Sequence, residues 1–271
     1  MKAKLGVITE KKWFSTLIWI VLLIIAWEIG AVVVEQTKRT PENILPHLHK
    51  IVEAAFSPKA VSNGMSAAMV VLTSAGATLF RALLGFIPGV VVGFVLALVM
   101  KISNLIEKTL FPYLMLIQLI PVLGLAPIIL AITGDINAAR VIIAAVLSFY
   151  PVATNTLAGF KSVEKEKYEL MYIYAASPVT LYKKVLIPAA MPYFFTGLKI
   201  AAPLAITASI LVDTLQGDGG LGCMLSQSLK HAMSINVFWL IVFFSALIGI
   251  LSGKIIGFIE NMVAPWKREK Q

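Results

Sequence analysis

Long uncharged stretches alternate with short charged connections along most of the chain. A transmembrane helix needs about 20 mostly apolar residues, and six stretches reach this length: residues 14–34, 70–100, 109–133, 141–160, 192–212 and 237–259. Few charged side chains interrupt them, among them Glu28, Arg81 and Lys199. The pattern predicts an all-α integral membrane protein with six transmembrane helices.

The first stretch follows a run of lysines, as a signal peptide would. A signal peptide ends in a small-x-small cleavage site, but Trp27-Glu28 follows the apolar region here. We therefore expect a retained first span.

Small residues recur at every fourth position of the second stretch. Gly85, Gly89, Gly93 and Ala97 share one face of a helix, and small residues on one face let a neighbouring backbone approach closely in lipid. This stretch is predicted to pack inside a bundle. The third stretch holds prolines at positions 112, 121 and 127, so we expect it to be kinked.

Basic residues are divided unevenly between alternate connections. Fourteen Lys and Arg lie on the side of the N-terminus and six on the opposite side. Because cytoplasmic segments are richer in Lys and Arg, both termini and a charged loop at about residues 161–190 are predicted to be cytoplasmic. The loop at about residues 35–68 is then extracytoplasmic, with a short amphipathic helix around residues 46–56.

The cytoplasmic loop mixes charges with aromatic side chains. Pro disfavours helix in the residue before it, so Ser177-Pro178 is expected to separate two short helices, and later prolines are expected to close the second. The result would be a compact knob suited to docking in a groove of another protein.

Composition agrees with a lipid environment. Hydrophobic residues make up 59% of the chain and charged residues 14%, against about 45–50% and 25% in soluble domains. The net charge of +9 comes from basic residues between apolar runs, which does not suit a nucleic-acid partner. The single cysteine, Cys223, excludes an internal disulfide.

No catalytic or nucleotide-binding motif is present: GxSxG, HExxH and GxxxxGK[ST] are all absent. We therefore expect no enzyme activity and no cofactor or metal in this chain. His47 and His49 are spaced so that their rings would point apart on a helix, and we expect solvated loop histidines rather than metal ligands.

Polar residues inside the stretches are candidates for a translocation path, although such side chains usually join helices to one another. They are Gln118, Ser148, Thr154, Asn155, Thr207 and Ser209. Asp213 closes the fifth stretch and is expected at the membrane interface rather than at an outer gate. Lys199 is expected to reach the cytoplasmic surface or to pair with a loop carboxylate, more than to hold an anionic solute.

Several short motifs, taken in chain order, resemble one family. The loop begins with Glu169 and reaches Leu186-Ile187-Pro188, which is similar to the Glu-Ala-Ala…Gly…Leu-Pro motif of ABC importer permeases. Further matches are residues 78–81, 85–86, 89, 93, 155–159, 196–199 and 219–222. The chain thus resembles the nitrate/sulfonate/taurine branch of these permeases over residues 78–266.

The resemblance implies a single permease domain over residues 1–271, with its core at residues 70–266, in the type I ABC importer fold. It implies a multi-pass protein of a prokaryotic cell membrane, paired with an identical or related permease. Two cytoplasmic subunits would bind ATP, and an extracytoplasmic protein would deliver a small solute. That solute would be a nitrate-, sulfonate- or taurine-like anion, or a vitamin precursor such as a pyrimidine or riboflavin.

The resemblance also implies which loop residues couple the permease to its ATPase: Glu169, Tyr172, Tyr174, Ala175, Ala176, Ser177, Pro178, Leu186 and Pro188. Several positions depart from the family: Leu170 and Met171 stand where the motif has two alanines, and residues 131–134 stand where Trp-Phe-Gly is usual. Ala175 stands where the motif has glycine, so either that glycine serves close packing, which alanine can share, or the turn differs. Asp213 stands where glutamate is usual.

A secondary transporter or channel without an ATPase is one alternative, and a purely structural membrane scaffold, which the kinked spans do not favour, is another. Secondary transporters usually show an internal repeat or ion-pairing charges at mid-membrane. No convincing duplication of one half in the other is visible.

Overall fold

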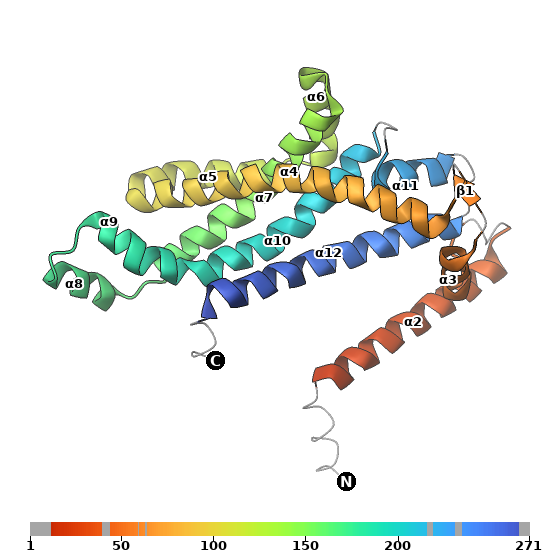
Figure 1. The fold of residues 1–271 in the computed structure, drawn as a ribbon, viewed down its shortest axis with the longest axis horizontal. Coiled ribbons are helices and arrows are strands. Elements are labelled where there is room, and N and C mark those ends of the chain that lie inside the picture. Colours follow the sequence, from red (N-terminus) through yellow and green to blue (C-terminus); the bar gives the residue numbers. More distant parts are fainter. Residues whose placement is uncertain are drawn as a thin grey trace, which may run out of the picture. The chain divides into compact units, whose positions relative to one another are not determined.

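The computed structural model describes residues 12–39, 44–58, 60–62, 64–215, 219–230 and 235–265. These residues form helices and one short hairpin (Figure 1). The elements are α2 (Lys12–Thr37), α3 (Leu48–Phe56), β1 (Ala60–Ser62), β2 (Met65–Ser66), α4 (Ala67–Ile102), α5 (Asn104–Leu119), α6 (Val122–Thr133), α7 (Ile136–Lys161), α8 (Lys165–Ile173), α9 (Pro178–Leu181), the π-helix η2 (Tyr182–Leu186), α10 (Ile187–Asp213), α11 (Leu221–Lys230) and α12 (Ile235–Val263).

The chain divides into two compact units. Unit 1 comprises Met1–Val71 and Leu225–Val242, and unit 2 comprises Leu72–Met224 and Phe243–Gln271. Unit 1 holds α2, the predicted short helix α3, and the antiparallel hairpin β1–β2. Unit 2 holds most of α4, the helices from α5 to α10, and the C-terminal part of α12.

Five helices in the described residues are long and apolar enough to cross a membrane. They are Phe14–Thr37, Ala67–Ile102, Ile136–Lys161, Pro178–Asp213 and Ile235–Val263, which confirms the predicted first, second, fourth, fifth and sixth spans. The fourth begins earlier than predicted because Asp135 caps it. Its carboxylate accepts hydrogen bonds from the backbone N–H groups of Asn137 and Ala138, at 3.0 and 3.2 Å.

The third predicted span is broken in two rather than being one continuous helix. Residues 109–133 fall into α5 and α6, and the two are bent by 100° (Figure 1). Ile120, between them, is extended, with ψ of 126°, as expected for a residue that precedes proline. Pro121 then caps α6. The pair is therefore a broken span or a re-entrant segment.

Glycines bring α4 and α7 close together. A Cβ atom placed on Gly85 would lie 2.5 Å from the Cβ of Ala144, and one on Gly93 would lie 2.5 Å from the carbonyl oxygen of Phe149. On Gly89 it would lie 2.7 Å from the carbonyl oxygen of Ala145. Any larger side chain on this face would collide with the α7 backbone.

The core of unit 2 lies around α7 and is largely alanine and branched aliphatic side chains. Gly197 of α10 approaches α7 in the same way, since its Cβ would lie 2.8 Å from the carbonyl oxygen of Pro151. One buried cluster joins α6, α7 and α10 and contains Ala126, Ile136, Ala139, Ile143, Ala144, Ala205, Ala208 and Val212. Small side chains at these positions keep the helices at short axial distances.

Candidate functional site

A helical loop, residues 161–190, leaves the end of α7 and leads into α10 (Figure 1). Its first helix, α8, ends in a Schellman turn. The Ala176 N–H bonds to the carbonyl of Met171 at 3.0 Å, and the Ala175 N–H bonds to that of Tyr172 at 2.9 Å. Ala175 adopts the left-handed conformation, with φ of 49°. Among the described residues, every other residue with a positive φ is a glycine. The left-handed turn is thus kept at the position where alanine replaces glycine.

The second loop helix begins as the sequence predicts. Ser177 is its N-cap and its hydroxyl accepts a hydrogen bond from the Thr180 N–H at 3.3 Å, while Pro178 occupies the first turn. This helix does not close at Pro188, contrary to the expectation. It passes through η2, where the Ile187 N–H bonds to the carbonyl of Tyr182, and continues into α10.

The π-helical turn explains this continuity. Proline lacks an N–H, and in a regular helix its ring collides with the carbonyl four residues earlier. A π turn immediately before Pro188 shifts the hydrogen-bond register by one residue. The loop and the fifth span therefore form one helix, Pro178–Asp213.

Large side chains are exposed around the tip of this loop. Tyr172, Ile173 and Tyr174 are 87%, 77% and 74% exposed. Glu169 is also exposed and pairs with Lys165 one turn earlier, at 3.2 Å. Exposed apolar groups gathered on one loop are typical of a docking surface.

The base of the loop is fixed in unit 2. Leu186 is buried in a cluster with residues of α4, α5, α7 and α10, and Pro188 is half-buried beside it. Lys161 forms an ion pair with Glu107 at the start of α5. The members of the cluster are Ala97, Met100, Leu114, Phe149, Ala153, Leu157, Phe160, Leu186 and Ala190.

A hollow of about 360 Å³ lies between α5, α6, α7 and α10. Two of the predicted path residues, Gln118 and Asn155, line it, together with Tyr150 and Thr154 of α7. The Asn155 Nδ2 donates to the carbonyl of Pro151 at 2.7 Å, and the Thr154 hydroxyl donates to that of Tyr150 at 3.0 Å. The sequence analysis did not single out Tyr150, because it stands between Phe149 and Pro151 in a mostly apolar stretch.

The other predicted path residues lie elsewhere. Ser148 and Ser209 are fully buried and donate to the carbonyls of Ala144 and Thr78, at 2.6 and 3.2 Å. Thr207 is exposed and donates to the carbonyl of Pro203 in its own helix. These three hydroxyls are thus hydrogen-bonded to backbone rather than gathered in the hollow.

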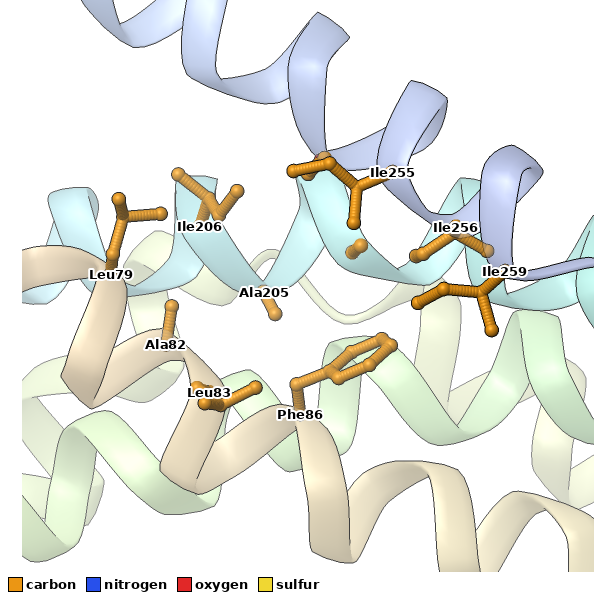
Figure 2. Close-up of a pocket in the computed structure, with 11 residues that line it drawn as sticks. Leu79, Ala82, Leu83, Phe86, Ala205, Ile206, Ile255, Ile256 and Ile259 are labelled. Carbon is orange, nitrogen blue, oxygen red and sulfur yellow. The ribbon is translucent and has the colours of Figure 1, made fainter.

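A second, apolar groove lies between α4, α10 and α12, with a volume of about 260 Å³. Figure 2 shows aliphatic side chains and one phenylalanine around it. Its polar residue, Ser252, donates to the carbonyl of Gly249 in its own helix. This groove offers little to a polar solute.

Contrary to the expectation of a membrane-interface position, Asp213 is not exposed. It is fully buried, and its Oδ1 lies 2.7 Å from Nε of Arg140 and 3.4 Å from a terminal nitrogen of Arg81. The Thr78 hydroxyl donates to Oδ2 at 2.9 Å and accepts from the Leu221 N–H at 2.9 Å. A buried carboxylate is costly unless it has compensating partners. The two arginines and the Thr78 hydroxyl supply them, which is why Asp213 can lie inside the bundle.

Arg140 lies in the second turn of α7, and its side chain is fully buried. The sequence hints at the buried pair in one way: Arg81 and Arg140 stand beside apolar residues, and Asp213 ends another apolar stretch. The pairing itself joins segments far apart in the chain and leaves no periodic trace.

Lys199 forms its ion pair within the bundle. Its partner is Glu260 of α12, which is 3% exposed, rather than a loop carboxylate. This ion pair between α10 and α12 therefore takes the place of the expected contact with a loop carboxylate or the cytoplasmic surface.

The histidine pair belongs to unit 1 and differs from the expectation. The rings of His47 and His49 stack, with centroids 5.5 Å apart, because His47 is the N-cap of α3 rather than part of a helix. Its Nδ1 lies 2.6 Å from a carboxylate oxygen of Glu28, and the Leu48 N–H donates to the other oxygen. The hydrogen bond to Glu28 raises the pKa of His47 above its usual value. No metal-binding group of three acidic, histidine or cysteine side chains occurs among the residues the structure describes.

Together these features define a multi-pass membrane protein with an exposed helical loop and a largely apolar hollow that contains a few hydrogen-bonding side chains. The chain belongs to the family described as the binding-protein-dependent transport system inner membrane component, whose model matches residues 89–269. It is a permease of the ABC importer class.

Two curated relatives and one solved structure illustrate the match. The formylaminopyrimidine transport permease ThiX of Halalkalibacterium halodurans is 30% identical over 94% of this chain and 96% of its own. The nitrate import permease NrtB of Leptolyngbya laminosa is 28% identical over 70% of this chain and 67% of its own. The inward-facing MetNI methionine ABC transporter superposes with a TM-score of 0.62 at 17% identity, over 72% of this chain and 97% of the matched chain. The fold is therefore that of type I importer permeases.

Proposed function

We propose that this permease forms half of the translocation path of an ATP-driven importer in a prokaryotic cell membrane. A second permease, identical or related, completes the path, and a pair of cytoplasmic subunits binds the ATP. An extracytoplasmic binding protein delivers the solute. Both termini and the 161–190 loop face the cytoplasm, and residues 35–68 face the outside, in accordance with the excess of basic residues on the loop side.

The exposed tip of the 161–190 loop carries this proposal. Tyr172, Ile173 and Tyr174 place apolar surface in water, which is unfavourable unless a partner covers it. We assign this surface to a groove of the ATPase subunit. Ala175, Ala176, Ser177 and Pro178 form the tip, and Glu169 holds α8 through its pair with Lys165.

The base of the loop supports a lever role. Leu186 is anchored in the core of unit 2, and the helix from Pro178 to Asp213 is continuous. A displacement of the tip by ATP-driven closure would therefore move the fifth span directly. Two packings of the bundle, biased by nucleotide in the partner, are the physical requirement for alternating access.

The chain itself transports and carries out no catalysis under this proposal. The solute is small, and the relatives suggest a pyrimidine or an inorganic anion such as nitrate.

The test is to purify a tagged permease from its native membrane in mild detergent and to identify the proteins that accompany it. We expect a P-loop ATPase to co-purify, and expect Tyr172→Ser combined with Tyr174→Ser to abolish this. Ile132→Ser is the matched control, because Ile132 is 79% exposed at the end of α6, far along the chain from the loop.

A chain that purifies alone and moves solute down an ion gradient without ATP would contradict the proposal. The protein would then be a secondary transporter. Equal co-purification of the ATPase with the double variant would contradict the assigned docking surface.

A further inference from the structure

The hollow between α5, α6, α7 and α10 has the position and size of a solute site. Tyr150 lies near the middle of α7 (Ile136–Lys161) and Ile200 near the middle of α10, whereas Asn155 lies closer to the C-terminal end of α7. Its volume of about 360 Å³ falls in the range of small-molecule sites, about 300–1,000 Å³. The apolar groove of Figure 2, at about 260 Å³, falls below it.

The hollow combines apolar walls with uncharged hydrogen-bonding groups. Ile117, Leu125, Val146 and Leu204 contribute apolar surface. Gln118, Tyr150, Thr154 and Asn155 contribute amide and hydroxyl groups. A few polar groups in an apolar lining are typical of sites that fix the orientation of a ligand.

Hydrogen-bonding capacity remains in this lining. The Nδ2 of Asn155 is bonded to the carbonyl of Pro151, which leaves its Oδ1 as an acceptor. Among the described residues, the structure shows no hydrogen bond to that oxygen, to the amide of Gln118 or to the hydroxyl of Tyr150. Amides and a hydroxyl offer both donors and acceptors, as amides and nitrogen heterocycles require.

No residue that lines the hollow carries a charge, among those the structure describes. Basic residues inside α4, α7 and α10 form ion pairs away from the hollow. Arg81 and Arg140 pair with Asp213, and Lys199 pairs with Glu260. An anion in a site of low dielectric loses its hydration and needs cationic or multiple N–H donors in exchange. The hollow supplies no cation.

We infer that the solute of this permease is uncharged and binds in this hollow by hydrogen bonds to Gln118, Tyr150 and Asn155. An amide or a nitrogen heterocycle has the matching chemistry. This inference rests on the proposed function, because it assumes that the chain lines a path for solute.

The first experiment identifies the solute by its charge. Cells of the native organism, with and without this chain, are given a defined mixture of uncharged pyrimidines, purines and amides, with nitrate, methanesulfonate and ethanesulfonate as anions. Depletion of each compound from the medium is measured by mass spectrometry. We expect chain-dependent depletion of an uncharged compound, whereas chain-dependent depletion of an anion overturns the inference.

The second experiment tests the site with the compound so identified. Gln118→Leu and Asn155→Leu keep side-chain size and remove hydrogen bonds, each of which is worth a factor of about 3 to 10 in affinity. We expect KM for uptake to rise about three- to tenfold in each variant, with an unchanged amount of permease in the membrane and unchanged co-purification of the ATPase. Thr196→Val is the matched control, since its hydroxyl is exposed and donates to Pro192 within α10.

The outcomes separate the two proposals. An unchanged KM in both variants overturns the assigned site. If no compound shows chain-dependent uptake and no ATPase co-purifies, the importer proposal fails, and the inference about the solute fails with it.

Discussion

Removal of the Asp213 carboxylate should destabilise the bundle more than any change on the surface. Asp213 and Arg140 are both fully buried, with Nε and Oδ1 2.7 Å apart, and Arg81 is 19% exposed. In Asp213→Ala, Arg81 can turn toward water, but the Arg140 charge stays buried with its carboxylate lost. Breaking one partner of a buried ion pair costs about 3–5 kcal/mol.

The measurement is thermal unfolding of the purified permease in detergent. For a chain of this size, 1 kcal/mol corresponds to about 2–4 °C, so Asp213→Ala should lower Tm on the order of 10 °C. The matched control is Glu107→Ala, which breaks a pair whose lysine is 49% exposed. Such a pair contributes about 0–1 kcal/mol.

A double variant separates charge from packing. In Asp213→Ala with Arg140→Leu, no cation is left in the buried position, so part of the lost stability should return. A fall in Tm for Asp213→Ala no larger than that for Glu107→Ala would refute the reasoning, as would a double variant less stable than Asp213→Ala alone.

Three further predictions follow from single positions. Ala175→Gly removes a left-handed strain of about 1–2 kcal/mol, so amide hydrogen exchange in α8 should slow; faster exchange would contradict it. Gly93→Ala places a Cβ 2.5 Å from a backbone oxygen of α7, and should lower Tm by several degrees, since overpacking costs about 1–3 kcal/mol. The pKa of His47 is raised by Glu28, so this contact stabilises the folded state at pH below about 6.5 and is lost as pH rises through the raised value. The fluorescence of Trp27, whose indole donates to the carbonyl of Pro46, should follow that loss, and His47→Gln should abolish the pH dependence.

Hydropathy predicts the long spans because it measures the property that places them. In lipid every backbone group must be bonded within the segment, so a long apolar run has few alternatives to a helix. The repeat of Gly85, Gly89 and Gly93 carries similar information, since it marks the face of α4 that approaches α7. Both signals are local in the sequence, which is why they can be read without coordinates.

The break between α5 and α6 depends on a weaker signal. Three prolines mark the segment equally, yet Pro112 and Pro127 lie inside helices and Pro121 ends one. Proline is tolerated in a membrane helix where neighbours satisfy the freed groups. Which proline breaks the helix is therefore a property of its surroundings in the bundle.

The charge pairs could not be predicted from the sequence, because their partners lie far apart along the chain. Arg81 and Asp213 are 132 residues apart, and Glu28 and His47 are 19 apart. No periodicity connects such partners, and each charge taken alone suggests the membrane surface. Their pairing becomes visible only when both partners are placed.

The loop shows how a local departure from a motif is tolerated. Ala175 adopts a conformation that favours glycine, so the shape of the turn is set by more than its own residue. The loop is held at both ends, by the Lys161–Glu107 pair and by Leu186 in the core, and the Schellman hydrogen bonds close the turn between them. A strain of about 1–2 kcal/mol at one residue is smaller than the cost of withdrawing Leu186 from the core, since the loss of a buried leucine costs about 2–5 kcal/mol. The geometry of the tip is therefore imposed by its base, and this is what a rigid connection between a docking surface and the fifth span requires.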